Sequence, residues 1–533
     1  MTTTLYTAAA VHTLADDAGD GPARALLVRA GRVLATGDPA RLRAHAPAGT
    51  RIVDLGDSVV VPGFTDAHVH LTQFAEELMG VDLRSAASEQ EALRRVESHV
   101  RTMPPGAWLF GGSWNHNHWT PPAQPDRYGL DAVTGERPVT LISADAHTVW
   151  ANTAALHRLG ITRDTPDPVG GEIVRDAAGE ATGILRESAV FPVRELQNGP
   201  AGGDGVEQFR AAQRYLLAQG VTGVHDVDGM TVLHAAERLR ADGDLHLRLH
   251  KLLPVADLDE HIAAGLRTGD GDPWIRIGPV KIFSDGALGS HTCLMTHPFA
   301  DSTGGTSNGD DHGVEVTAPA QLDALLTHAA SHGIAAAVHA IGDRANGQVL
   351  DAFARAADLT REHRLRHRIE HVQFIRRPDL DRLAALGVVA SMQPQHYAPD
   401  LSLRHFVPDD GLAAYAWRSV LDAGVTLAFG SDAPVEAPRP LHGIAAAVAR
   451  WGPDGRPGRW QPAERLTPRE ALAAYTTGAA AASGESTIKG TLAPGMLADF
   501  VALDIDPLTA TSDAVRDATV RATVVDGVIR YRA

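Results

Sequence analysis

From residue 220 onward, short apolar or β-branched runs alternate with stretches of helical periodicity. One such stretch places Leu322, Leu325, Leu326 and Ala329 on a single helical face. Alternating strands and helices are typical of βα units around a parallel sheet. The expected strands are residues 220–227, 245–253, 279–286, 334–343, 366–374, 387–394 and 425–435, and an earlier run, 59–71, makes eight. Eight strands predict an α/β fold of the closed (β/α)8 TIM-barrel type. An open doubly wound sheet is the alternative, since periodicity does not show closure.

Composition is that of an ordinary globular protein, with 44% hydrophobic and 21% charged residues. The net charge of -17 provides no electrostatic footprint for nucleic acid or an anionic membrane, so we expect neither partner. A single cysteine, Cys293, excludes an internal disulfide framework and fits a reducing compartment. The N-terminus lacks a secretory pattern and no stretch of ~20 apolar residues occurs, so a cytoplasmic location is expected.

At 533 residues, the chain exceeds the usual size of a single core. Short β runs at both ends, 1–61 and 484–533, predict one composite β-sandwich. Residues 62–483 are expected to form the barrel, with a large insertion after its first strand, 72–205. In a barrel such an insertion emerges on the active-site face, which predicts a substrate lid. The alternative is a small satellite core filled by the insertion's four tryptophans.

The run VVVPGFTDAHVHL, 59–71, carries an apolar strand into His68 and His70. Side chains two positions apart share one face of a strand, so both imidazoles point the same way. Neutral imidazole is the commonest protein metal ligand. A hydrogen-bonded histidine pair is the alternative for this motif taken alone.

Further polar residues stand near the ends of other expected strands: Lys281, His339, His371 and Asp432. Each has a structural explanation by itself, such as a buried histidine or a helix cap for Asp432. Lys281 is the hardest to explain that way, because an unpaired ammonium in a buried strand costs several kcal/mol. Carbamylation would convert Lys281 into an anion able to bridge two cations. Because carboxyl strand ends converge in a barrel, the joint pattern predicts a metal site with nitrogen and oxygen ligands.

These segments resemble the amidohydrolase superfamily, specifically the amidohydrolase-3 group of YtcJ-like proteins that includes N-substituted formamide deformylase. The resemblance runs from GRVLATG through PGFTDAHVHL, VKIFSDGALGS, VHAIGD, RIEHVQF, MQPQH and FGSDAPV to PGMLADFVALD. It implies one or two divalent cations, usually zinc, in a barrel with a composite β-sandwich.

The same resemblance implies roles for individual residues. His68 and His70 would bind the first metal, His339 and His371 the second, and Asp432 would be the catalytic acid/base. Lys281 matches the position of a carbamylated bridging lysine in many members. Glu187 is a rival anionic metal ligand, and His291 stands where an arginine would be expected.

The predicted reaction is hydrolysis of a carbon-nitrogen bond outside ordinary peptides in a small-molecule substrate. Metal-bound water would attack the carbonyl, and Asp432 would pass its proton to the leaving amine. Trp114, His147, His291 and His396 are candidates for substrate binding. A deaminase or a lactone or cyclic amide hydrolase is the alternative within enzymes, and a non-catalytic binding protein is the remote one. The resemblance also suggests a homodimer.

Overall fold

The computed structural model describes residues 3–15, 23–104, 106–116, 119–143, 148–168, 171–190, 192–193, 205–289, 292–299, 312–407, 411–452, 455–456 and 458–533. The chain divides into two compact units. We call Met1–Leu71 with Gln213–Ala533 the barrel unit, and Thr72–Ala212 the insertion unit.

The barrel unit contains an eight-stranded sheet in which neighbouring strands are parallel. Its strands are β6 (Phe64–Val69), β13 (Val221–Asp226), β14 (Arg248–Pro254), β15 (Ile275–Phe283), β16 (Ala336–Ala340), β17 (Arg368–His371), β19 (Val389–Met392) and β21 (Leu427–Phe429). A parallel bridge between Val69 and Ala433 joins the last strand's end to the first. The predicted TIM barrel is therefore confirmed, and the open sheet is excluded.

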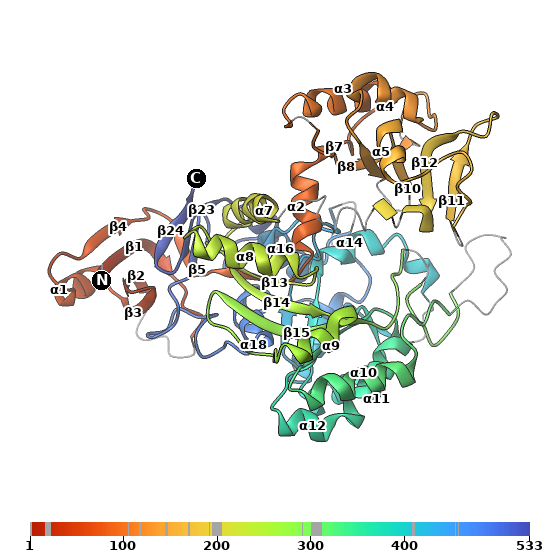
Figure 1. Cartoon of the computed structure of the whole chain (residues 1–533). Helices are drawn as coiled ribbons and strands as arrows, with labels where there is room; N and C mark the ends of the chain where they lie inside the picture. The colour runs from red at the N-terminus through yellow and green to blue at the C-terminus, as the bar shows by residue number, and fades with distance from the viewer. Residues whose placement is uncertain are drawn as a thin grey trace. The chain divides into compact units, whose positions relative to one another are not determined.

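Helices surround these strands, as the green and cyan segments of Figure 1 show. They are α7 (Val206–Ala218), α8 (Thr231–Ala241), α9 (Leu258–Ala263), α10 (Pro319–Ser331), α11 (Asp343–Arg355), α12 (Ala357–Glu362), α13 (Arg377–Ala385), α14 (Tyr397–Asp400), α15 (Trp417–Asp422), α16 (Pro440–Ala449), α17 (Pro468–Ala473) and α18 (Ala479–Ala482). In α10, Leu322 and Leu326 are buried at i, i+4 spacing, as the periodicity predicts. Among the described helices, none is long and apolar enough to cross a membrane.

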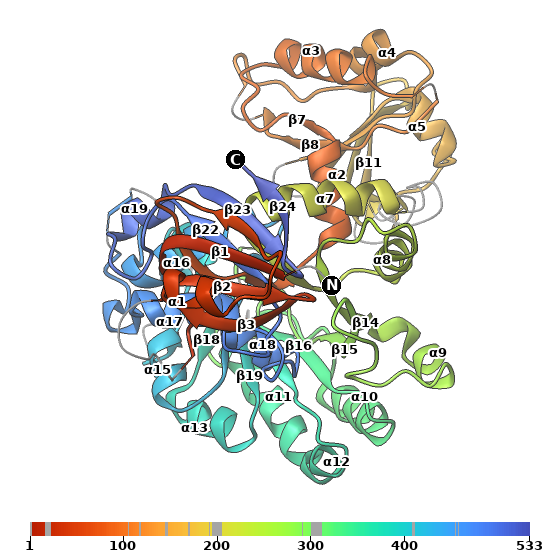
Figure 2. The ribbon, with the colours of Figure 1, turned by 90° about the vertical axis from the view of Figure 1, so that its left-hand side faces the viewer.

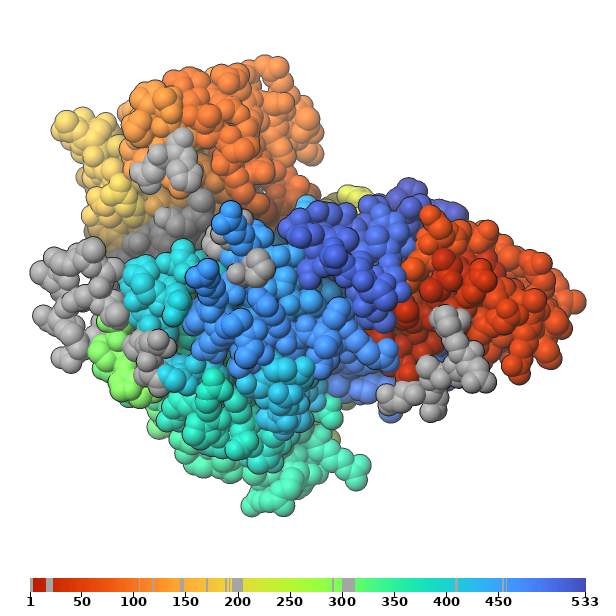
Figure 3. Space-filling view, turned by 180° about the vertical axis from the view of Figure 1, so that it is seen from behind, coloured from red at the N-terminus to blue at the C-terminus, as the bar shows by residue number. Residues whose placement is uncertain are grey.

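Strands from both ends of the chain pair in a second eight-stranded sheet of the barrel unit. Figure 2 shows the red N-terminal strands and the blue C-terminal strands side by side. In Figure 3, seen from behind, the surfaces of the same two segments adjoin each other. β5 (Val59–Pro62) pairs with β22 (Phe500–Leu503), and the other strands are β1 (Thr3–Val11), β2 (Ala23–Arg29), β3 (Arg32–Gly37), β4 (Arg51–Asp54), β23 (Val520–Val525) and β24 (Val528–Arg532). Helices α1 (Pro39–His45) and α19 (Ser512–Arg516) also belong to these terminal segments. Tyr6 and Phe500 pack edge to face in the apolar core beside this terminal sheet.

The insertion unit has its own mixed sheet and apolar core. Its elements are α2 (Leu71–Met79), β7 (Val81–Asp82), α3 (Glu89–Val100), β8 (Gly111–Trp114), α4 (Arg127–Thr134), β9 (Thr140–Ser143), β10 (Thr148–Ala151), α5 (Thr153–Arg158), β11 (Gly171–Arg175) and β12 (Ala181–Glu187). Trp114, Trp119 and Trp150 contact one another in the core, with ring centroids about 6 Å apart. Trp114 is buried and donates a hydrogen bond to the Leu141 carbonyl. Trp114, a predicted substrate-binding residue, thus lies in the core of the insertion unit.

Candidate metal centre

The seam that closes the barrel brings the first three site residues together. His68 and His70 lie at the end of β6, with ring centroids 5.9 Å apart. Asp432 follows β21, and its backbone N–H donates to the His68 carbonyl at 2.8 Å. The Asp432 carboxylate oxygen Oδ1 consequently lies 3.3 Å from His68 Nε2 and 3.5 Å from His70 Nε2.

Two more predicted ligands reach the same place from neighbouring strands. His339 on β16 and His371 on β17 have ring centroids 4.5 Å apart, and His371 lies 5.0 Å from His68. Possible ligand atoms of His68, His371 and Asp432 all lie within 4.8 Å of one another. Parallel strands thus gather residues from four distant sequence segments into one buried cluster.

Every one of the four histidines has its Nδ1 atom engaged by a side-chain acceptor. His68 donates to Glu370 at 2.6 Å and His70 to Asp228 at 2.8 Å. The corresponding partners of His339 and His371 are Asp285 at 3.0 Å and Gln393 at 2.8 Å. Neutral imidazoles held in this way present an unprotonated Nε2, which is the usual arrangement around a protein-bound metal. The donor set therefore fits a transition metal such as zinc.

Lys281 is buried on β15, and its Nζ atom has no hydrogen-bond partner among the described residues. Burial lowers the pKa of its ammonium to about 8, against the opposing influence of the Glu370 and Asp432 carboxylates. The Nζ atom lies 4.6 Å from the ring centroid of Phe283. An orphaned buried amine of lowered pKa close to His68, His70 and His371 is chemically unusual, which makes Lys281 a candidate functional residue.

Electrostatics favour the neutral form of His68 and His371 and the charged form of Asp432. Burial and the charge of Lys281 lower the pKa of His68 to about 4, and burial holds the pKa of His371 well below its ordinary value. Burial also disfavours the charged form of His70, but Asp228 outweighs it and raises the pKa. For Asp432, burial is outweighed by His68 and the other neighbouring cationic groups, so its pKa is lowered.

The backbone at the cluster is strained. His371, Val372 and Asp432 have positive φ angles of 79°, 47° and 60°. Such a conformation is an outlier for a β-branched residue like Val372, and costs about 1–3 kcal/mol per residue. Strain at two cluster members and the residue beside one of them is typical of a functional site.

The remaining predicted site residues have different outcomes. His396 joins the cluster: its Nε2 lies 3.9 Å from Asp432 Oδ2 and its ring is nearly parallel to that of His371. His147 and His291 lie outside the described residues. Glu187 is the last residue of β12 in the insertion unit, and its side chain also lies outside the described part of the chain.

Sequence reasoning missed the four acceptors that orient the histidines: Asp228, Asp285, Glu370 and Gln393. A usable signal existed, because Glu370 and Gln393 are polar residues inside or just after buried strands. Asp285 also accepts backbone hydrogen bonds from Leu294, Ile341 and Gly342, which hold its carboxylate in place.

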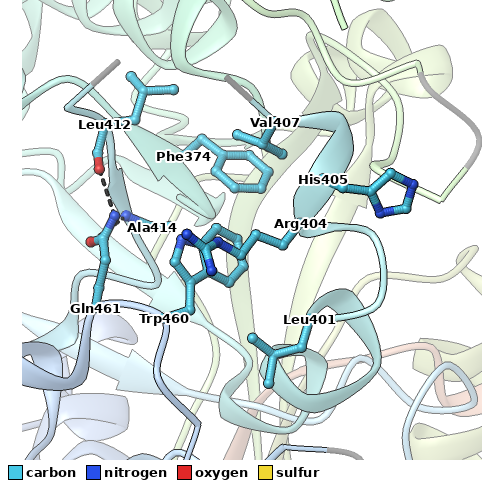
Figure 4. Close-up of a pocket in the computed structure, with 9 residues that line it drawn as sticks. All are labelled: Phe374, Leu401, Arg404, His405, Val407, Leu412, Ala414, Trp460 and Gln461. Carbon is cyan, nitrogen blue, oxygen red and sulfur yellow. Dashed lines mark hydrogen bonds between the residues drawn. The ribbon is translucent and has the colours of Figure 1, made fainter. Parts of the chain in front are cut away.

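A hollow of about 380 Å³ is lined by the segments that follow β17, β19 and β21 (Figure 4). Its lining residues are Phe374, Leu401, Arg404, His405, Val407, Leu412, Ala414, Trp460 and Gln461. The Phe374 and Trp460 rings are 6.0 Å apart, and Gln461 donates to the Leu412 carbonyl. Phe374 follows His371 by three residues, which at full extension span about 10 Å.

A barrel with this cluster at its strand ends defines the class of protein, a metal-dependent hydrolase. A solved structure of the same class agrees. The crystal structure of an uncharacterized metal-dependent hydrolase from Pyrococcus horikoshii OT3 matches with a TM-score of 0.81 and 27% identity, covering 96% of this chain and 99% of that one.

The sequence profile described as "Amidohydrolase family" matches residues 51–531. The putative amidohydrolase YtcJ of Bacillus subtilis is 32% identical, covering 95% of this chain and 96% of its own. N-substituted formamide deformylase of Arthrobacter pascens is 31% identical, covering 97% and 96%. The chain therefore belongs to the amidohydrolase family, and the resemblance noted in the sequence is confirmed.

Proposed function

We propose that this metal-dependent hydrolase cleaves the carbon-nitrogen bond of a non-peptide amide, with N-substituted formamides as the leading substrate class. The observation that carries the proposal is the set of four histidines whose Nδ1 atoms are all engaged, which leaves their Nε2 atoms as the possible ligand atoms, two of them within 3.5 Å of Asp432 Oδ1. The likeness to N-substituted formamide deformylase over nearly the whole chain supports the substrate class.

In this proposal His68 and His70 hold one divalent cation, most simply zinc, and His339 and His371 hold a second. A carbamylated Lys281 would supply a further anionic oxygen ligand, and the lowered pKa of its ammonium favours the neutral amine that reacts with carbon dioxide. Bound cations would supply a nucleophile from water at neutral pH and polarise the substrate carbonyl.

Asp432 is the proton-transfer group of the proposed reaction. Its lowered pKa keeps the carboxylate ionised and ready to accept a proton from the attacking water. The same oxygen then returns the proton to the leaving nitrogen as the carbon-nitrogen bond breaks. His396, whose Nε2 lies 3.9 Å from Asp432 and has no hydrogen-bond partner among the described residues, is placed to donate to the substrate.

The aromatic hollow of Figure 4 is the proposed receptor for the substituent of the amide. Leu401, Val407 and Trp460 give its wall an apolar part for an apolar or aromatic group.

A substrate screen tests the proposal directly. Zinc-loaded protein is incubated with N-alkyl and N-benzyl formamides, N-acyl amines and cyclic amides, with separate detection of amines, ammonia and acids. Release of a primary amine from a formamide is the expected result. Release of ammonia alone, or of acid without any amine, would instead assign a deaminase or a lactone-type hydrolase.

A further inference from the structure

A buried ion pair contacts His68 of the histidine cluster and takes no part in the proposed proton transfer. Arg368 and Glu370 are two positions apart on β17, and neither is exposed. Arg368 Nε donates to Glu370 Oε1, and its Nη2 group donates to Oε2 at 2.9 Å. This two-point geometry is the strongest that arginine and a carboxylate form.

Four strands hold the guanidinium of Arg368 in this position. Besides Glu370 on its own strand, it donates to the Ala67 carbonyl on β6 and to Ser391 Oγ on β19. Its Nη1 group also lies 3.0 Å from His225 Nδ1 on β13. Because arginine only donates hydrogen bonds, every group facing it must accept.

The Glu370 oxygen Oε2 is shared between Arg368 and His68. It accepts from Arg368 and also from His68 Nδ1 at 2.6 Å. A carboxylate that only accepts forces the His68 proton onto Nδ1 and keeps Nε2 free.

We infer that Arg368 and Glu370 form a tautomer lock: a positioning pair that fixes the proton of His68 on Nδ1 and aims its Nε2 at the metal. The inference rests on the metal site of the proposed function. It assigns to the buried ion pair a role in metal affinity, distinct from any role in holding the barrel together.

The substitution Glu370→Gln is the sharpest probe. The new amide has one accepting and one donating end, and Arg368 requires acceptors, so the NH₂ group must face either Arg368 or His68 Nδ1. With the NH₂ group toward His68, the proton is forced off Nδ1; with it toward Arg368, the two-point ion pair that holds the side chain in place is lost. We expect Zn²⁺ to bind about 10- to 100-fold more weakly, measured by competition with a chelating dye.

The matched control removes another buried arginine-carboxylate ion pair, which lies at the opposite end of the barrel strands. Asp499 accepts two hydrogen bonds from the buried Arg248, which is the first residue of β14. Asp499→Asn therefore breaks a buried arginine-carboxylate pair far along the chain from the histidines. Its expected effect is a lower melting temperature of the metal-free protein with Zn²⁺ affinity within about twofold of wild type.

Glu370→Asp provides the second variant in case the amide prevents folding. It keeps a carboxylate for Arg368 but is one methylene shorter, so contact with His68 is lost while the charge remains. The expected result is a folded protein with weakened Zn²⁺ binding and an altered visible absorption spectrum of the Co²⁺ form. Wild-type Zn²⁺ affinity in both Glu370 variants would overturn the inference, whereas a wild-type protein that binds no Zn²⁺ would overturn the proposed metal site itself.

Discussion

At the scale of single residues, the proposed function gives the histidines and Asp432 different roles, metal binding and proton transfer. Asp432 contacts His68 and His70 through Nε2 and is the one carboxylate among the grouped possible ligands of the described chain. Its replacement therefore tests catalysis more directly than any histidine substitution does.

Asp432→Asn is expected to retain bound metal and lose activity. The amide preserves the shape but does not accept a proton, so kcat should fall by about 10²- to 10⁴-fold. Metal content by elemental analysis and kcat on the best amide from the screen are the two measurements. Near-normal turnover with full metal content would remove Asp432 from the proton-transfer role.

His367, a buried histidine outside the cluster, predicts how the stability of the fold depends on pH. Ala336 N–H donates to its Nδ1 and its Nε2 contacts Thr360 Oγ1, so both nitrogens are used by the neutral ring. Burial lowers the pKa of His367 to about 4, against about 6.5 in an unfolded chain. Between about pH 6.5 and 4 the unfolded state therefore binds a proton at His367 that the folded state does not bind. The free energy of unfolding falls as pH falls through this window.

His367→Gln keeps an acceptor for Ala336 but does not titrate. In metal-free protein, the loss of unfolding free energy between about pH 6.5 and 5 should be smaller in the variant by up to about 2 kcal/mol. Denaturant unfolding at the two pH values measures this difference. Parallel losses in variant and wild type would mean that His367 is already accessible to protons in the folded protein.

At the scale of elements, the seam between β21 and β6 is the tightest constraint on the site. A Cβ atom at Gly430 would lie 2.4 Å from the His68 backbone nitrogen and 2.8 Å from Asp66 Oδ1. The close approach of the two strands, which sets the distance from Asp432 to His68, therefore requires glycine.

Gly430→Ala should separate the seam, lower stability by about 1–3 kcal/mol and weaken metal binding. Gly223→Ala on β13 is the control, because a Cβ there meets its nearest atoms at 3.5 Å, an ordinary contact. Thermal melts and Zn²⁺ titrations of both variants decide the matter. Equal behaviour of the two would show that the seam adjusts without cost to the site.

The sequence predicted the periodicity of individual elements better than it predicted the residues at which they end. The expected strand 366–374 is in fact β17, which ends at His371, followed by the short β18 (Phe374–Ile375). Backbone with positive φ at His371 and Val372 interrupts the strand, and no local propensity of these residues favours that conformation.

At the scale of the whole molecule, metal binding should stabilise the barrel unit as a whole, because the proposed ligands come from the ends of β6, β15, β16 and β17. A ligand at about 100 times its dissociation constant adds about 2.7 kcal/mol to the folded state. Chelation should therefore lower the melting temperature of the wild-type protein by several degrees. The double variant His68→Ala/His70→Ala should show a much smaller shift, and an equal shift would place the stabilising metal elsewhere.

The sequence alone was sufficient for the strand count, the alternation with helices and the residue types of the site, because apolar periodicity and the positions of His68, His70, His339, His371 and Asp432 are local properties. The tertiary structure decided which acceptor holds each imidazole. His68 and Glu370 are 302 positions apart, and nothing local to either predicts the 2.6 Å hydrogen bond between them. Closure of the barrel brings them together, because only a closed ring of strands points both side chains into one interior.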